Sequence, residues 1–203
     1  MMKLHWSPRS PFVRKVMIAA HELGFADRIQ TVRTLVGATI VNRELLAENP
    51  INKIPTLVLE DGTVLFDSHV IIEYLDDLAG GGKLIPKPGP ARWQELRRHA
   101  LANGLLEQLL LWMAERNKPH PLPALLEAYA LKASSALAAL EAEIDAIAQA
   151  PVGIAQITIA IVGDYLDFRF PDLGWRAGHP KLSAWQTAFA QRPSVRANPV
   201  TEG

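Results

Sequence analysis

A serine and a proline stand together where the first helical pattern of the sequence begins. Ser10 is a favourable N-cap residue, and Pro11 suits the first helical position, where its missing N–H costs no hydrogen bond. A helix N-terminus carries unpaired N–H groups and a partial positive charge, so it favours an anion, to which a nearby hydroxyl can donate. Ser10 is therefore a candidate for stabilising an anionic ligand atom such as a thiolate; the alternative is that it only caps the helix.

The energy that this chemistry requires is modest. A free thiol has a pKa of about 8.5, so only a small fraction of it is ionised at neutral pH. Lowering that pKa by about 2 units requires about 2.7 kcal/mol of preferential thiolate stabilisation. A hydroxyl that donates to a charged group supplies about 1.5–3 kcal/mol, and a helix end adds about 0.3–1 kcal/mol. Together they suffice without a general base.

The composition limits the partners and the chemistry of the chain. There is no cysteine, which excludes disulfides, thiolate metal sites, a cysteine nucleophile and protein-based disulfide exchange. Any sulfur chemistry must therefore use the sulfur of a ligand. The 21 Lys and Arg residues balance the 21 Asp and Glu residues, so no basic surface is expected for nucleic acid. The six histidines lack ligand spacing, and we expect no metal.

The hydropathy of the chain gives no sign of a membrane partner. No stretch reaches the roughly 18 consecutive apolar residues of a membrane span, and the first residues lack the apolar run of a signal peptide. We therefore expect a cytoplasmic protein whose partner is a small molecule.

Two further segments contain groups suited to hold an extended peptide-like ligand. Ile54-Pro55 precedes a strand pattern, and a cis bond there would present the N–H and C=O of Ile54 to such a ligand, although an ordinary trans proline is the alternative. Asp67 and Ser68 stand at the start of a helical pattern, where a carboxylate, a hydroxyl and free N–H groups suit the head of an α-amino acid. The alternative is again a simple helix cap.

The elements that must position these segments follow from the patterns along the chain. The expected strands cover residues 2–6, 28–33, 56–60 and 63–66, and Asp61-Gly62 forms a hairpin turn between the last two. The expected helices of this part cover residues 11–23, 41–48 and 68–75. The run Gly80-Gly81-Gly82 and three prolines over residues 80–90 mark a linker, after which only helical patterns occur, at 91–117, 123–149, 157–170 and 181–191. The sequence thus predicts an α/β domain over 1–79, a linker over 80–90 and an all-helical domain over 91–203.

These motifs, in this order and spacing, resemble the cytosolic glutathione transferase family, in particular its bacterial members with a serine-type active site. The likeness spans nearly the whole chain, and it implies a thioredoxin-like N-terminal domain followed by a C-terminal helical bundle, usually in a homodimer. It rests on Ser10-Pro11-Phe12, Asn49-Pro50, Lys53-Ile54-Pro55-Thr56, Asp61-Gly62, Phe66-Asp67-Ser68, Ile72-Glu73-Tyr74-Leu75, His179-Pro180-Lys181-Leu182, Trp185 and Arg192-Pro193-Ser194-Val195.

The resemblance also implies roles for individual residues. Ser10 matches the catalytic hydroxyl, with Ser7 of the same loop as the alternative under a shifted alignment. Ile54 matches the residue before the family's cis-proline, and Asp67 and Ser68 match the pair that holds the γ-glutamyl group. The expected contacts to glutathione are made by Phe12, Lys53, Ile54, Pro55, Asp67 and Ser68.

Two positions depart from the family pattern. Asn52 stands where glycine is usual, and Thr158 takes the place of an N-cap residue, but Ile161 follows it where an acid is usual. The resemblance implies a glutathione transferase that activates the thiol of bound glutathione, its co-substrate, for attack on a small apolar electrophile, as in detoxification. The departures leave open a non-enzymatic interaction or regulatory module of the same fold.

Overall fold

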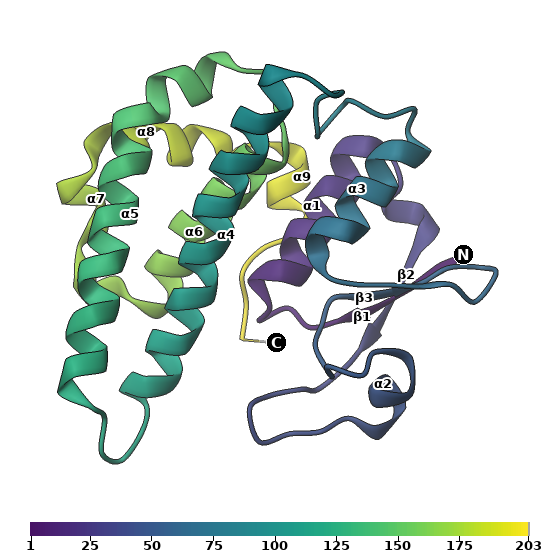
Figure 1. The fold of residues 1–203 in the computed structure, drawn as a ribbon, viewed down its shortest axis with the longest axis horizontal. Coiled ribbons are helices and arrows are strands. Elements are labelled where there is room, and N and C mark those ends of the chain that lie inside the picture. The colour runs from purple at the N-terminus through teal and green to yellow at the C-terminus, as the bar shows by residue number, and fades with distance from the viewer. Residues whose placement is uncertain (203) are drawn as a thin grey trace. The chain divides into compact units, whose positions relative to one another are not determined.

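The computed structural model describes residues 1–202, which divide by their internal packing into two units (Figure 1). One unit comprises residues 1–88 together with 193–202, and the other comprises residues 89–192. The first is a thioredoxin-like sheet covered by helices and the second is helical, which confirms the predicted fold class. This grouping differs from the domains predicted from the sequence. Residues 193–202 were expected in the helical domain, but they pack with the first unit.

A four-stranded sheet forms the centre of the first unit. Its strands are β1 (Met2–Trp6), β2 (Ile29–Arg33), β3 (Thr56–Val58) and β4 (Val64–Leu65), in the spatial order β2-β1-β3-β4. Strand β1 is parallel to β2 and antiparallel to β3, with His5 opposite Thr56, and β3 is antiparallel to β4, with Leu57 opposite Leu65. The C-terminal ends of β1 and β4 therefore meet the N-terminal end of β3 at one end of the sheet.

Helices cover the two faces of this sheet. α1 (Pro11–Leu23) and α3 (Ser68–Leu78) pack against each other on one face, and α2 (Arg43–Glu48) lies on the other side (Figure 1). Alternating side chains of β1 serve both faces, as strand geometry requires. Leu4 is fully buried, whereas its neighbours Lys3 and His5 contact Glu48 of α2.

The first helix has the start and the end that its sequence predicts. Ser10 is its N-cap, Pro11 is its first residue, and Gly24 follows it with φ +77°, the left-handed conformation typical of a helix C-terminus. Val13, Val16 and Ala20, three residues of the predicted apolar face, are fully buried. The apolar pattern therefore fixes which side of α1 packs on the sheet, and the two caps fix where the helix begins and ends.

The carboxylate of Asp76, near the end of α3, organises the segment that follows. Its oxygens accept hydrogen bonds from the backbone N–H groups of Gly82, Lys83 and Leu84, at 2.8, 3.0 and 2.7 Å. Leu84 and Ile85 are buried. The predicted linker is thus ordered by Asp76, and its residues 80–88 belong to the first unit.

The second unit consists of helices, and a 3-10 turn, Pro171–Leu173, links two of them. α6 packs against α4 and α8, and α5 packs against α4 and α8. The helices are α4 (Pro90–Arg116), α5 (Pro123–Gln149), α6 (Ile154–Arg169), α7 (Trp175–Gly178) and α8 (Pro180–Phe189). The remaining short elements, a 3-10 turn at Ala26–Arg28 and α9 (Pro193–Arg196), belong to the first unit, where α9 packs on α1.

The start of α6 corrects the sequence prediction. The predicted N-cap, Thr158, lies inside the helix, where its hydroxyl donates to the carbonyl of Ile154 at 2.7 Å, so its assignment as a cap was wrong. Gly153 is the N-cap, and the side chain of Gln156 accepts from its N–H at 2.9 Å. Glycine has no capping side chain, and Glu95 of α4 supplies one by accepting from the N–H of Ala155 at 2.7 Å.

Over residues 1–202, no helix combines the length and the apolar character needed to cross a membrane.

Candidate functional site

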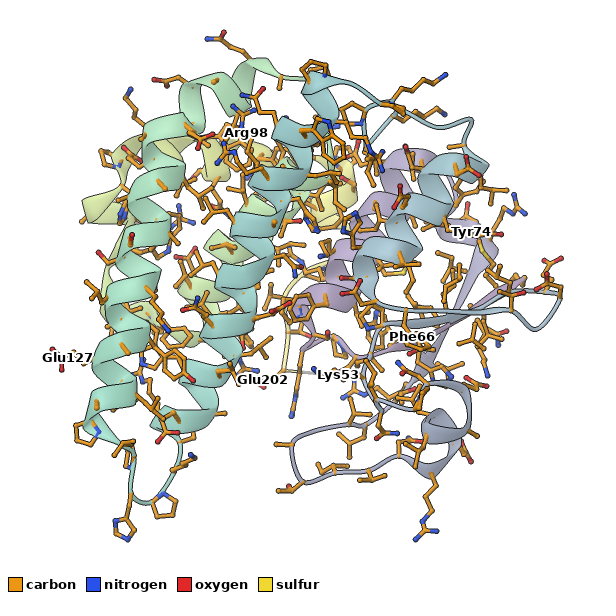
Figure 2. The ribbon with its side chains drawn as sticks, in the orientation of Figure 1. Lys53, Phe66, Tyr74, Arg98, Glu127 and Glu202 are labelled. Carbon is orange, nitrogen blue, oxygen red and sulfur yellow. The ribbon has the colours of Figure 1, made fainter. Side chains whose placement is uncertain are left out.

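The three segments with candidate site residues meet at one end of the sheet in the first unit. Ser10 follows β1, Ile54-Pro55 precedes β3, and Asp67-Ser68 follows β4. Because β1 and β4 run in the same direction and β3 runs against them, these loops share the end defined by the His5–Thr56 pair. Figure 2 labels Lys53 and Phe66, which flank this end on the loops next to β3 and β4. Ser10 is thereby brought close to two segments that lie more than forty residues away in sequence.

Ser10 joins this end of the sheet to the N-terminus of α1. Its Oγ accepts a hydrogen bond from the N–H of Val13 at 3.2 Å, and its carbonyl accepts from Arg14 at 3.0 Å. The Val13 bond uses a lone pair of the hydroxyl and leaves its proton available for donation. Ser7 lies in the preceding turn, where its carbonyl accepts from the N–H of Ser10 at 3.2 Å. Of the two serines, Ser10 is the one at the helix terminus.

The loop before β3 is shaped by the buried side chain of Asn49. Its amide nitrogen donates to the carbonyl of Lys53 at 3.1 Å and to the hydroxyl of Thr56 at 2.8 Å, and its oxygen accepts from the N–H of Ile51 at 3.1 Å. Within this loop the Ile54–Pro55 bond is cis, as the family resemblance implies. Asn49 thus holds the backbone carbonyl before the two candidate residues and the side chain of the residue after them. The sequence indicated Asn49 only as a helix end.

A second asparagine explains the departure from glycine at position 52. Asn52 has φ +52°, a conformation that asparagine tolerates better than most residues. Its side chain pairs twice with the backbone of Asn42, accepting from the N–H at 2.9 Å and donating to the carbonyl at 2.6 Å. Asn42 in turn caps α2 through the N–H of Leu45. The two asparagines therefore tie the loop to the start of α2, a contact that glycine could not make.

The C-terminal end of α2 is held to β1 by charged groups. Glu48 accepts from Lys3 and from Nε2 of His5, both at 2.5 Å, while Nδ1 of His5 lies 2.8 Å from the hydroxyl of Thr34. Burial by itself raises the pKa of Glu48, but the hydrogen bonds and charges of Lys3 and His5 outweigh it and hold the pKa below its ordinary value. This ion-pair cluster anchors the residue immediately before Asn49.

Asp67 and Ser68 form the third part of the site. Asp67 is the N-cap of α3, and one of its carboxylate oxygens accepts from the N–H of His69 at 2.9 Å. The Phe66–Asp67 bond is also cis. Asp67 is exposed, whereas Ser68 is 2% exposed. A negative side chain thus stands beside the free N–H groups of a helix start.

The two remaining candidates lie on α1 and on the loop before β3. Phe12 is half-buried on α1, with the ammonium of Lys15 lying 5.4 Å from the centre of its ring. Lys53 is exposed, and its carbonyl is held by Asn49. Within residues 1–202, no group of three or more histidine or acidic side chains is arranged to hold a metal ion.

The fold and this end of the sheet define a class of protein, a thioredoxin-like domain joined to a helical domain. The sequence model described as "Glutathione S-transferase, N-terminal domain" matches residues 9–78. A crystal structure of a glutathione transferase family member from Pseudomonas fluorescens Pf-5, with bound glutathione, is 40% identical, with a TM-score of 0.95, and the match covers 99% of this chain and 100% of that one. The chain belongs to the glutathione S-transferase family.

Two other comparisons describe its relatives further. Another crystal structure of a Pf-5 family member contains S-(propanoic acid)-glutathione and is 39% identical, with a TM-score of 0.91, over 99% of this chain and 100% of that one. An uncharacterized GST-like protein, YibF, from Escherichia coli K12 is 28% identical over 98% of both chains.

Proposed function

We propose that the protein is a glutathione transferase whose Ser10 hydroxyl donates a hydrogen bond to the thiolate of bound glutathione. The observation that carries the proposal is the hydrogen bond from the N–H of Val13 to Ser10 Oγ, which leaves the hydroxyl proton available at the N-terminus of α1. The hydroxyl stays protonated and acts as a donor. The thiolate sulfur then attacks an electrophilic carbon of a small substrate, and the new carbon–sulfur bond forms as the leaving group, such as a halide, departs with its bonding electron pair, consistent with a role in detoxification.

We propose that the neighbouring loops hold the rest of the tripeptide. Ile54 pairs through its backbone with the extended ligand as a strand would, and Pro55 and Phe12 pack against it. Asp67 pairs with the ammonium of the γ-glutamyl group, and Ser68 with the N–H groups of α3 binds its carboxylate. Lys53, an exposed cation on the same loop, reaches a ligand carboxylate. The glutathione present in the Pf-5 crystal structure supports this assignment.

The decisive experiment measures the pKa of glutathione's thiol in the complex by thiolate absorbance, with Ser7→Ala as the matched control. In the wild type and in Ser7→Ala this pKa should lie well below that of free glutathione. Ser10→Ala should raise it and slow conjugation of an activated aryl halide, while affinity for glutathione is largely kept. If Ser10→Ala changes neither quantity, Ser10 is only a helix cap. If Ser7→Ala has the effect instead, the catalytic hydroxyl is that of Ser7.

A non-enzymatic module of the same fold is the rival function. The two departures that left room for it have structural roles of their own, since Asn52 pairs with Asn42 and Gln156 with Glu95 completes the start of α6. A thermal-shift titration with glutathione discriminates between the two functions. Ligand at about one hundred times its Kd adds about 2.7 kcal/mol to the free energy of unfolding. Millimolar glutathione that produces no shift would favour the module.

We further propose that the protein works as a homodimer in the cytoplasm, as its family resemblance implies. Sedimentation tests the homodimer, and cell fractionation tests the location. The crystal structure of a relative with bound S-(propanoic acid)-glutathione supports a further proposal about the ligands of this protein. We propose that this chain also accepts glutathione conjugates that have a short substituent on the sulfur.

A further inference from the structure

Residues 197–202, called here the return segment, run back along α1 towards its N-terminus (Figure 1). The path is fixed at three levels of the helix. Glu22 near its end accepts from the hydroxyl of Ser194, and Arg14 in its middle donates to the carbonyl of Asn198. Arg9, just before its N-cap, donates to Glu202, which is labelled in Figure 2. All of these residues belong to the first unit, so the path is a property of that unit alone.

The contact between Arg9 and Glu202 has both a backbone and a side-chain part. Nε of Arg9 lies 2.7 Å from the carbonyl oxygen of Glu202 and 3.5 Å from its carboxylate oxygen Oε2. The two side chains are 55% and 59% exposed. An ion pair at this exposure contributes only about 0–1 kcal/mol, so another carboxylate can displace the carboxylate of Glu202 from Arg9 at little cost.

Arg9 is the residue next to the proposed thiolate donor. It precedes Ser10, so the two Cα atoms are about 3.8 Å apart. A guanidinium presents donors in a planar fork that matches a carboxylate, and the carboxylate of Glu202 lies within ion-pair distance of it here. Arg9 is therefore a cation suited to bind a carboxylate, and it is adjacent in sequence to Ser10, which would hold the sulfur of glutathione. In the free protein the carboxylate of Glu202 is paired with Arg9.

We propose that Arg9 selects electrophiles that have a carboxylate on the group transferred to the sulfur, and that Glu202 occupies Arg9 until such a ligand displaces it. This inference rests on the proposed function and names the electrophile class of the same site. For a β-halogenated short-chain acid, the thiolate sulfur attacks the carbon that bears the halogen. The new carbon–sulfur bond forms as the halide leaves with the bonding electron pair, and nothing is oxidised or reduced. Arg9 holds the carboxylate throughout and is a specificity-determining residue.

The primary test compares binding of S-carboxyethylglutathione with that of S-propylglutathione, which lacks the negative charge on the sulfur substituent. Titration calorimetry should give the wild type a preference for the charged ligand, and Arg9→Gln should lower that preference about tenfold. Glu202→Gln should raise the preference, because the internal competitor is weakened. Arg28→Gln removes an exposed cation elsewhere in the same unit and should leave the preference unchanged.

The outcomes separate this inference from the proposed function. If Arg9→Gln weakens both ligands equally, Arg9 contacts the tripeptide and the inference is wrong. It is equally wrong if the preference survives in Arg9→Gln. If the wild type binds neither these ligands nor glutathione, the proposed function itself fails. A kinetic comparison uses β-bromopropanoate and β-bromopropanamide, which differ in charge and hardly in length. The preference for the charged substrate in kcat/KM should be lower in Arg9→Gln and higher in Glu202→Gln than in the wild type.

Discussion

Glu95 of α4 accepts a hydrogen bond at 2.7 Å from the backbone N–H of Ala155, in the first turn of α6. The residue that begins α6 is Gly153, which has no side chain to fill this role. A carboxylate sixty residues away in sequence therefore satisfies a helix N–H that a serine, threonine or aspartate N-cap ordinarily satisfies. The bond also joins α4 to α6, so it stabilises the packing of the helical unit as well as the start of one helix.

Removing this carboxylate should destabilise the helical unit. Glu95→Ala leaves the N–H of Ala155 buried without its acceptor, and we expect the free energy of unfolding to fall by about 1–2 kcal/mol. Urea denaturation followed by circular dichroism measures the change. Glu107→Ala, which removes an exposed carboxylate from the same helix, is the control and should have a smaller effect. Equal effects of the two substitutions would show that the Ala155 bond contributes nothing.

The protonation of Glu95 should appear in the pH dependence of stability. Burial raises the pKa of Glu95 above its ordinary value, against the opposing effects of the Ala155 N–H and the charge of Arg98. The native state then binds this proton more tightly than the unfolded state, so the contribution of Glu95 falls as pH rises through the native pKa. Relative to Glu95→Gln, the wild type should gain melting temperature as pH is lowered from 7 towards the ordinary value of 4.5. A constant difference would contradict this.

Glu48 should show the opposite pH dependence. Its pKa is held below the ordinary value of 4.5, so the stability it contributes is complete above that value and is lost as pH falls through the native pKa. The wild type should therefore exceed Glu48→Gln in melting temperature at neutral pH, and the difference should shrink in acid below 4.5. Differential scanning calorimetry of both proteins across this range tests the prediction. A difference that grows in acid would contradict the ion-pair account.

Replacing Asn52 should lower the free energy of unfolding by an amount that depends on the new residue. Asn52→Ala loses both hydrogen bonds to Asn42 and puts at positive φ a residue that tolerates this conformation less well than asparagine, so we expect a loss of about 2–4 kcal/mol. Asn52→Gly loses the hydrogen bonds but tolerates the backbone angle, and should cost less. Chemical denaturation gives the order, and a glutathione titration should show weaker binding in Asn52→Ala. If alanine is tolerated better than glycine, positive φ is not the constraint.

The charge of Asp67 should matter for binding glutathione more than for folding. Asp67→Asn keeps an oxygen that can accept from the N–H of His69 but removes the negative charge opposite the proposed ammonium. We expect affinity for glutathione to fall about tenfold, with little change in the melting temperature of the free protein. Asp61→Asn in the hairpin turn is the matched control. Unchanged affinity in Asp67→Asn would place the γ-glutamyl ammonium elsewhere.

The sequence by itself determined the features that are local in the chain. The order of strands and helices over residues 1–79, the caps of α1 at Ser10 and Gly24, and the start of α3 at Asp67 were all predicted correctly. So were the first two long helices after the linker, to within a residue at each end. Such features depend on apolar periodicity, turn residues and caps, all of which act over a few residues.

Only the tertiary structure decided the contacts between distant segments. The cap of α6 was predicted wrongly because its acceptor, Glu95, comes from another helix. The positioning roles of Asn49 and Asn52 were missed because a polar loop residue has the same appearance in sequence whether it is solvated or buried. Likewise, the return segment meets Arg9 across nearly the whole chain, and no local pattern specifies such a contact. Propensities constrain each segment separately, whereas the partner of a side chain depends on which segments the packed core brings together.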